Sequence, residues 1–145
     1  MPHVFTDPIR PHFVNEAIPT TYSEVWGDYF GVWRGSRERQ AFLGLLPTLL
    51  AVAGWIAFLL RSRRLPARLA VALLPGLGIL GYLYFTVSYP TPDGDVLKAS
   101  YMLTTAPAWA LVFGYAVDRL PGRLRLVTAG VLAASALASL PFLLY

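Results

Sequence analysis

The sequence predicts an all-α, polytopic membrane protein with four transmembrane helices preceded by an aromatic interfacial helix. Of the 145 residues, 56% are hydrophobic and 14% are charged, and the mean hydropathy of +0.53 is high for a soluble domain of this size. The apolar residues form four long runs, and seven of the eleven arginines lie in two short connections between them. Such a pattern is typical of integral membrane proteins.

Residues 1–20 are predicted to form an irregular external segment, because they contain four prolines and show no hydrophobic periodicity. The segment lacks the basic start and apolar core of a signal peptide. His3 and His12 have no neighbours at metal-ligand spacing, and the chain has no cysteine. No metal site and no cofactor are predicted.

Residues 21–36 are predicted to form the aromatic interfacial helix. Thr21 and Glu24 have capping-box spacing. Large side chains then recur every three or four residues, at Tyr22, Val25, Trp26, Tyr29, Phe30 and Trp33. An aromatic face suits the membrane interface, where rings are buried and their polar tips stay hydrated. An alternative is the wall of a substrate cleft, in which Trp26 or Trp33 stacks on a sugar or lipid and Asp28 binds a hydroxyl.

The four apolar runs, residues 41–60, 69–89, 99–117 and 126–145, are the predicted membrane spans and together form a domain over 41–145. Each run is about 20 residues long, which at 1.5 Å per residue covers one hydrocarbon core of about 30 Å. None contains Asp, Glu, Lys, Arg or His. A coupled transporter usually keeps an ionisable residue inside a span, so this function is disfavoured.

The connections between the spans predict the orientation. Residues 61–68 contain four arginines and residues 118–125 contain three, whereas residues 90–98 contain one lysine and two aspartates. Positively charged connections favour the cytoplasm, so the hairpin 90–98 and both termini are predicted to be external. Binding of anionic lipid headgroups is an alternative use of the arginines. Because the arginines follow a topological pattern, nucleic acid is not a predicted partner.

An external N-terminus requires the export of about 40 residues, Arg34 and Arg37 included, without a cleavable signal. That is awkward for an independent protein and natural for the end of a longer polytopic one. The chain is therefore expected to be a C-terminal part of a larger membrane protein.

Two stretches resemble a known family. They are Trp-Gly-Asp-Tyr-Phe-Gly-Val-Trp, from Trp26 to Trp33, and Asp-Gly-Asp-Val-Leu-Lys-Ala-Ser-Tyr, from Asp93 to Tyr101. Standing before a span and at the external start of a Pro-containing span, they resemble the C-terminal region of bacterial GT-C-type glycosyltransferases, which are related to dolichyl-phosphate-mannose mannosyltransferases. The resemblance covers roughly residues 20–120. It implies location in the bacterial inner (cytoplasmic) membrane and a polyprenyl-phosphate-linked sugar as donor.

The resemblance also implies roles for individual residues. Lys98 would supply the cation that holds the carrier phosphate, and Tyr101, one turn on, would donate a hydroxyl. A snorkelling anchor paired with Asp93 or Asp95 is the alternative for Lys98. In this family the catalytic carboxylate lies in an early external loop, which this chain lacks between two early spans. We therefore expect a C-terminal membrane module that is not catalytic alone and whose partners are membrane lipid, the polyprenyl-phosphate sugar and an N-terminal transferase portion or partner membrane chain.

The second function expected from the sequence is a small noncatalytic membrane subunit that packs against a larger membrane partner. Such a subunit needs the same apolar helices and no reactive residue. An adjacent reading frame that encodes early spans with an external acidic loop would favour the transferase over such a subunit.

The predicted orientation can be tested with single cysteines, since the chain has none of its own. Gly94→Cys is expected to react with a membrane-impermeant thiol reagent in intact cells, because residue 94 lies in the external hairpin. Pro66→Cys, in an arginine-rich connection, is expected to react only after permeabilisation. The reverse labelling would overturn the orientation.

Overall fold

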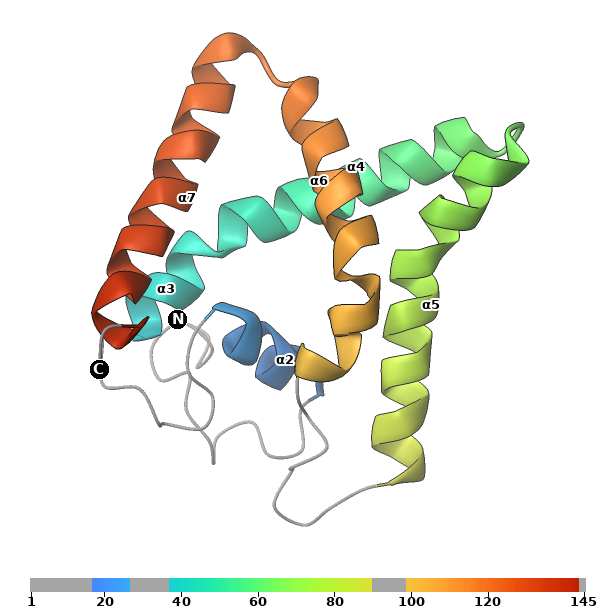
Figure 1. Cartoon of the computed structure of the whole chain (residues 1–145), viewed down its shortest axis with the longest axis horizontal. Helices are drawn as coiled ribbons and strands as arrows, with labels where there is room; N and C mark the ends of the chain where they lie inside the picture. Colours follow the sequence, from blue (N-terminus) through green and yellow to red (C-terminus); the bar gives the residue numbers. More distant parts are fainter. Residues whose placement is uncertain (1–16, 27–36, 90–98, 144–145) are drawn as a thin grey trace.

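The computed structural model describes residues 17–26, 37–89 and 99–143, and within these ranges the regular elements are all helical. They are α2 (Ala17–Trp26), α3 (Arg37–Leu43), α4 (Leu45–Ser62), α5 (Pro66–Ser88), the 3₁₀ helix η1 (Ala99–Thr105), α6 (Ala106–Asp118) and α7 (Gly122–Leu143) (Figure 1). The all-α class predicted from the sequence is confirmed.

Two helical stretches of the described chain, residues 39–62 and 66–88, are long and apolar enough to cross a membrane. In each, only 17% of the most apolar window is buried inside the protein. The central helix of a soluble domain would be mostly buried, so this exposed apolar surface suits a lipid environment. The two stretches contain the first predicted span and nearly all of the second. Membrane crossing by the third and fourth predicted spans stays a prediction.

The first of these stretches is interrupted at Gly44, where α3 ends and α4 begins. Hydrogen bonds continue across the interruption, from the amide of Gly44 to the carbonyl of Gln40 (2.9 Å) and from the amide of Thr48 to the carbonyl of Gly44 (3.0 Å). Pro47 has no N–H and cannot donate to the carbonyl of Leu43. The irregularity therefore falls in the turn from which proline removes a bond.

Helices α4 and α6 pack closely around a glycine. A Cβ atom at Gly54 would collide with the carbonyl oxygen of Val112 and lie 2.8 Å from the Cβ of Ala116. Next to this contact, the rings of Trp55 and Trp109 meet edge to face, with centroids 5.6 Å apart. Val112 is completely buried. The centre of the fold is thus a backbone-to-backbone approach flanked by a tryptophan pair.

Helix α5 packs against α4 and η1 through small residues. The indole N–H of Trp55 donates to the carbonyl of Ala72 (2.8 Å). A Cβ atom at Gly76 would lie 3.0 Å from Cζ2 of Trp55, and one at Gly78 would lie 2.6 Å from Cγ2 of Thr105. Glycine at these two positions lets the three elements approach.

The third predicted span, residues 99–117, is helical throughout but is not a single α-helix. Residues 99–105 form η1 and only the remainder is α-helical. Pro107 lies in the first turn of α6 and has no N–H to donate to the carbonyl of Leu103. The α-helical hydrogen bonds of α6 therefore do not extend back into residues 99–105. Upstream, the Thr105 hydroxyl donates to the carbonyl of Met102 (2.9 Å). The tighter 3₁₀ winding fills the segment before the proline.

Helix α2 also differs from its prediction. It begins at Ala17, inside the segment predicted to be irregular, and residues 27–36 of the predicted helix 21–36 lie outside the described residues. Pro19 falls in the first turn, where its missing N–H would have no helical partner. Thr21 is inside the helix rather than at its cap, and its hydroxyl donates to the Tyr82 hydroxyl (2.6 Å). The capping-box prediction is wrong.

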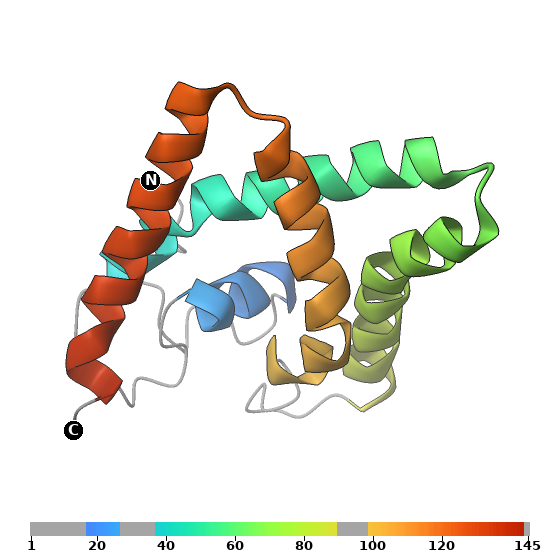
Figure 2. The ribbon, with the colours of Figure 1, turned by 45° about the horizontal axis from the view of Figure 1, so that its top comes forward.

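The two arginine-rich connections, residues 61–68 and 118–125, are called the arginine turns below. Both lie in the upper part of Figure 1, the α6–α7 turn at the top and the α4–α5 turn at the right edge. Helix α2, the end of α5 and the start of η1 lie on the opposite side, and the tilted view keeps this separation (Figure 2). Which side of a membrane each connection faces stays a prediction.

The glycine contact between α4 and α6 predicts unequal effects of two matched substitutions. Gly54→Ala is expected to lower the free energy of unfolding by about 1–3 kcal/mol, because the added methyl group forces the helices apart. Gly81→Ala is the control, since a Cβ there meets no atom within 4 Å. It is expected to be neutral or stabilising by up to about 1 kcal/mol, from helix propensity alone. Thermal loss of the near-UV circular dichroism signal in detergent measures both, and equal melting temperatures would contradict the close packing.

Candidate functional site

The side of the protein opposite the arginine turns contains the predicted site residues that the structure describes. Trp26 lies at the end of α2 and Tyr101 lies in η1, and these two elements contact each other (Figure 1). Asp28, Trp33 and Lys98 lie outside the described residues. The described part of the candidate site therefore consists of α2, η1 and the helices that pack against them.

Trp26 fixes the end of α2 on α4. Its indole N–H donates to the Thr48 hydroxyl (2.7 Å). Its ring lies over Gly44, where a Cβ atom would collide with the indole. Glycine is thus required at the α3–α4 interruption for a spatial reason. These contacts give Trp26 a structural role, and sugar stacking by the same ring stays a prediction.

Tyr22 fixes the middle of α2 on α3. Its hydroxyl donates to the carbonyl of Ala41, a completely buried residue. Burial raises the pKa of Tyr22 from its ordinary value of 10.0 to about 12, because the phenolate would lose hydration. The neutral, donating form of Tyr22 is therefore the form that holds α2 in place.

Two hydroxyl residues on α2, Thr20 and Ser23, are completely buried. The Oγ of Ser23 has no hydrogen-bond partner among the described residues. A buried hydroxyl without a partner costs about 1–3 kcal/mol. The sequence interpretation concentrated on the aromatic face of this helix and missed these residues. Their spacing of three residues was the available signal for a second buried face.

Tyr101 is held by its ring and leaves its hydroxyl available. The ring lies against Phe85, with centroids 5.0 Å apart, and Phe85 also contacts Tyr89 at 5.3 Å. Tyr101 is 48% exposed. Its hydroxyl donates to no residue of the described chain. A phenol fixed at its ring and free at its tip can donate to a ligand oxygen.

Comparison with protein families, characterised proteins and solved structures finds no match to this chain.

In the ranges 17–26, 37–89 and 99–143, no three His, Asp or Glu side chains gather as a metal site would require. What the described site offers is aromatic surface and hydroxyl groups. These suit hydrogen bonding to a polar, oxygen-rich ligand at the edge of an apolar protein.

The attachment of α2 is expected to fail at high pH. Because the pKa of Tyr22 is raised in the folded state, the stabilisation by this residue is complete below pH 10 and is lost as the pH rises towards about 12. Spectrophotometric titration of tyrosinate tests this, as the difference between the wild-type protein and Tyr22→Phe. The difference curve should show one phenol titrating near pH 12. A midpoint near pH 10 would mean that Tyr22 is hydrated and α2 is not held by it.

Proposed function

We propose that the chain is the C-terminal membrane module of a glycosyltransferase that uses a polyprenyl-phosphate-linked sugar. The observation that carries the proposal is the Tyr101 hydroxyl, which is exposed and unbonded among the described residues at the start of an apolar helical segment. The 3₁₀ helix η1, which contains Tyr101, lies on the side opposite the arginine turns (Figure 1). With those turns in the cytoplasm, Tyr101 faces the external surface, where a flipped carrier lipid would present its phosphate.

The role of Tyr101 follows from the chemistry of the transfer. An acceptor hydroxyl attacks the anomeric carbon of the sugar, and the bond from that carbon to the phosphate oxygen breaks. The electron pair of that bond leaves with the polyprenyl phosphate, so negative charge grows on the phosphate oxygens. A hydroxyl donor and a cation stabilise this charge. Tyr101 supplies the donor and Lys98, three residues earlier, supplies the cation.

The catalytic base, which takes the proton of the acceptor hydroxyl, is assigned to an N-terminal transferase portion or a partner membrane chain. This chain supplies the carrier-binding surface instead. The exposed apolar surface of residues 39–62 and 66–88 supports such a role, because it leaves room for lipid or another helix beside the site. The proposed location is the bacterial inner membrane, with both termini external.

A small noncatalytic subunit that packs against a larger membrane partner is the second candidate, and α7 favours it. A Cβ atom at Gly130 meets no atom within 4 Å. Leu126 and Leu137 on the same helix are 74% and 64% exposed. A glycine that faces open space and lies near exposed leucines would let another membrane helix approach closely.

Two substitutions test the transferase proposal. Lys98→Met keeps the side-chain stem and removes the charge, and Tyr101→Phe keeps the ring on Phe85 and removes the hydroxyl. Each is expected to weaken binding of polyprenyl phosphate by roughly ten- to a hundred-fold, as expected for loss of one charge-assisted hydrogen bond. Native mass spectrometry of the purified chain with increasing polyprenyl phosphate measures the change.

The matched control is Tyr84→Phe, which removes the hydroxyl of a tyrosine that is 73% exposed on α5. It should bind the carrier like the wild-type protein. If all three variants bind equally, Lys98 and Tyr101 do not hold the carrier and the noncatalytic subunit is favoured.

A further inference from the structure

Three guanidinium groups gather around the C-terminal turn of α6. Arg61 of α4 donates to the Tyr115 hydroxyl (3.2 Å). The Cζ of Arg119 lies 3.4 Å from the centre of the Tyr115 ring, and its Nη1 donates to the Tyr115 carbonyl (2.9 Å). Arg125 of α7 donates to the carbonyl of Asp118 (2.8 Å). Residues from three helices thus bring like charges together.

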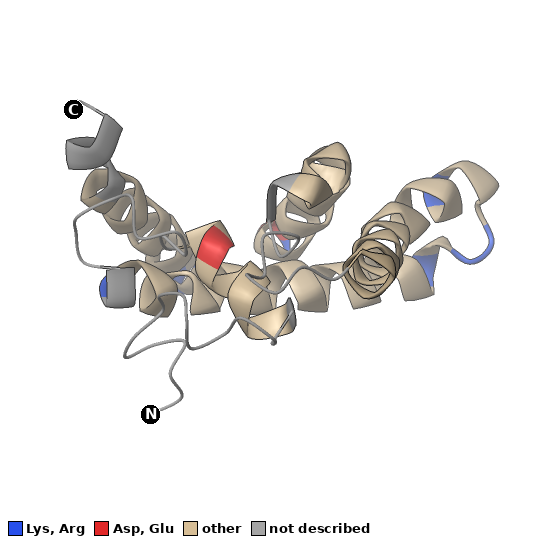
Figure 3. Ribbon diagram, turned by 90° about the horizontal axis from the view of Figure 1, so that it is seen from below, with Lys and Arg blue, Asp and Glu red and all other residues tan. Residues whose placement is uncertain are grey.

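The cluster has no acidic partner in the described chain. None of the arginines in the two arginine turns forms an ion pair with a described carboxylate, although Asp118 is adjacent in sequence to Arg119. Arginines are coloured blue at the α4–α5 turn in Figure 3, with no acidic residue there. Arg119 donates from Nη1 to the carbonyl of Tyr115, and Arg125 donates from Nη2 to the carbonyls of Asp118 (2.8 Å) and Leu120 (3.5 Å), whereas a guanidinium has five N–H donors. The remaining donors suit an anion with several oxygens.

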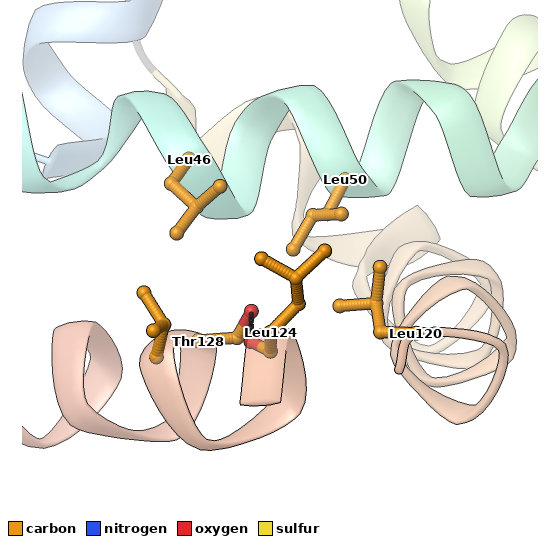
Figure 4. Close-up of a pocket in the computed structure, with 6 residues that line it drawn as sticks. Leu46, Leu50, Leu120, Leu124 and Thr128 are labelled. Atoms are coloured by element: carbon orange, nitrogen blue, oxygen red, sulfur yellow. Dashed lines mark hydrogen bonds between the residues drawn. The ribbon is translucent and has the colours of Figure 1, made fainter. Parts of the chain in front are cut away.

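An apolar cavity lies next to this cluster, and its lining includes Leu120, the residue that follows Arg119. It has a volume of about 110 Å³ and is lined by Leu46, Leu50, Leu120, Leu124, Val127 and Thr128. Figure 4 shows the leucines of α4 facing those of the α6–α7 corner across it. The hydroxyl of Thr128 donates to the carbonyl of Leu124 (2.9 Å), so no free polar group lines the cavity.

The cavity can be entered from outside, because Leu124 and Val127 are 51% and 55% exposed. Leu120 directly follows Arg119, and Leu124 directly precedes Arg125. A basic cluster and an apolar cavity therefore share the same short stretch of chain. Inorganic phosphate would satisfy only the first of these, whereas an amphipathic anion satisfies both.

We propose that the α6–α7 corner binds one anionic phospholipid. Its phosphate is held by the guanidinium groups of Arg119, Arg125 and Arg61, with Tyr115 positioning two of them, and one acyl chain enters the cavity between α4 and α7. Charge complementarity identifies the occupant, since an anionic lipid headgroup supplies the negative charge that no described carboxylate brings to the cluster. This site lies on the side opposite Tyr101 and is independent of the glycosyltransferase proposal.

The test is native mass spectrometry of the full chain with phosphatidylglycerol or phosphatidylcholine of identical acyl chains. The wild-type protein is expected to retain phosphatidylglycerol in preference. Arg119→Gln should weaken that binding about fivefold, the usual effect of one basic residue near an anionic lipid. Arg64→Gln, which changes an exposed arginine in the other arginine turn, is the control and should bind like the wild type.

The acyl-chain part of the proposal has its own variant. Leu124→Trp fills the cavity and should weaken binding on the order of tenfold, as expected when about two methylenes lose their apolar contacts. Leu126→Trp places the same ring on a residue that is 74% exposed and does not line the cavity, and should have no effect. Equal retention of the two lipids, unchanged binding by Leu124→Trp, or full competition by inorganic phosphate would each overturn the proposal. Unchanged helix content by circular dichroism shows that each variant folds.

Discussion

The close approach of α4 and α6 at Gly54 is the contact on which the rest of the arrangement depends. Because no side chain separates the helices there, Val112 is sealed and Trp55 and Trp109 are brought edge to face. Further along α4, the ring of Phe58 lies against that of Tyr115, with centroids 5.1 Å apart. In Figure 1, α6 runs steeply across α4, so the approach at Gly54 determines where the two helices meet.

The polar tips of three aromatic residues are bonded inside the protein. The indoles of Trp26 and Trp55 and the phenol of Tyr22 donate to groups on neighbouring helices. In an apolar surrounding an N–H or O–H without an acceptor is costly, so each such bond specifies which helix face meets which. The aromatic residues thus determine helix rotation, which apolar contacts alone define weakly.

The sequence predicted the helical class and two stretches that are long and apolar enough to cross a membrane, because an uninterrupted apolar run of this length has few alternatives. It did not predict the division of the third span, since Pro107 is tolerated in membrane helices and only the local packing shows which winding precedes it. In the site, Tyr101 could be identified from its place at the start of a span. The convergence of Arg61 and Arg119 on Tyr115 could not, because it depends on the rotation of α4 against α6.

The packing of Trp26 on Gly44 affects how easily the helix can bend there. A helix is most easily bent where its backbone is interrupted, and here that place is covered by a side chain from another helix. The indole therefore restricts bending at the α3–α4 interruption. The angle between α3 and α4 is energetically coupled to the packing of α2 on Gly44. Displacement of α2 removes the indole from Gly44 and frees the interruption to bend. A change at the surface where α2 lies therefore alters the long apolar helix α4.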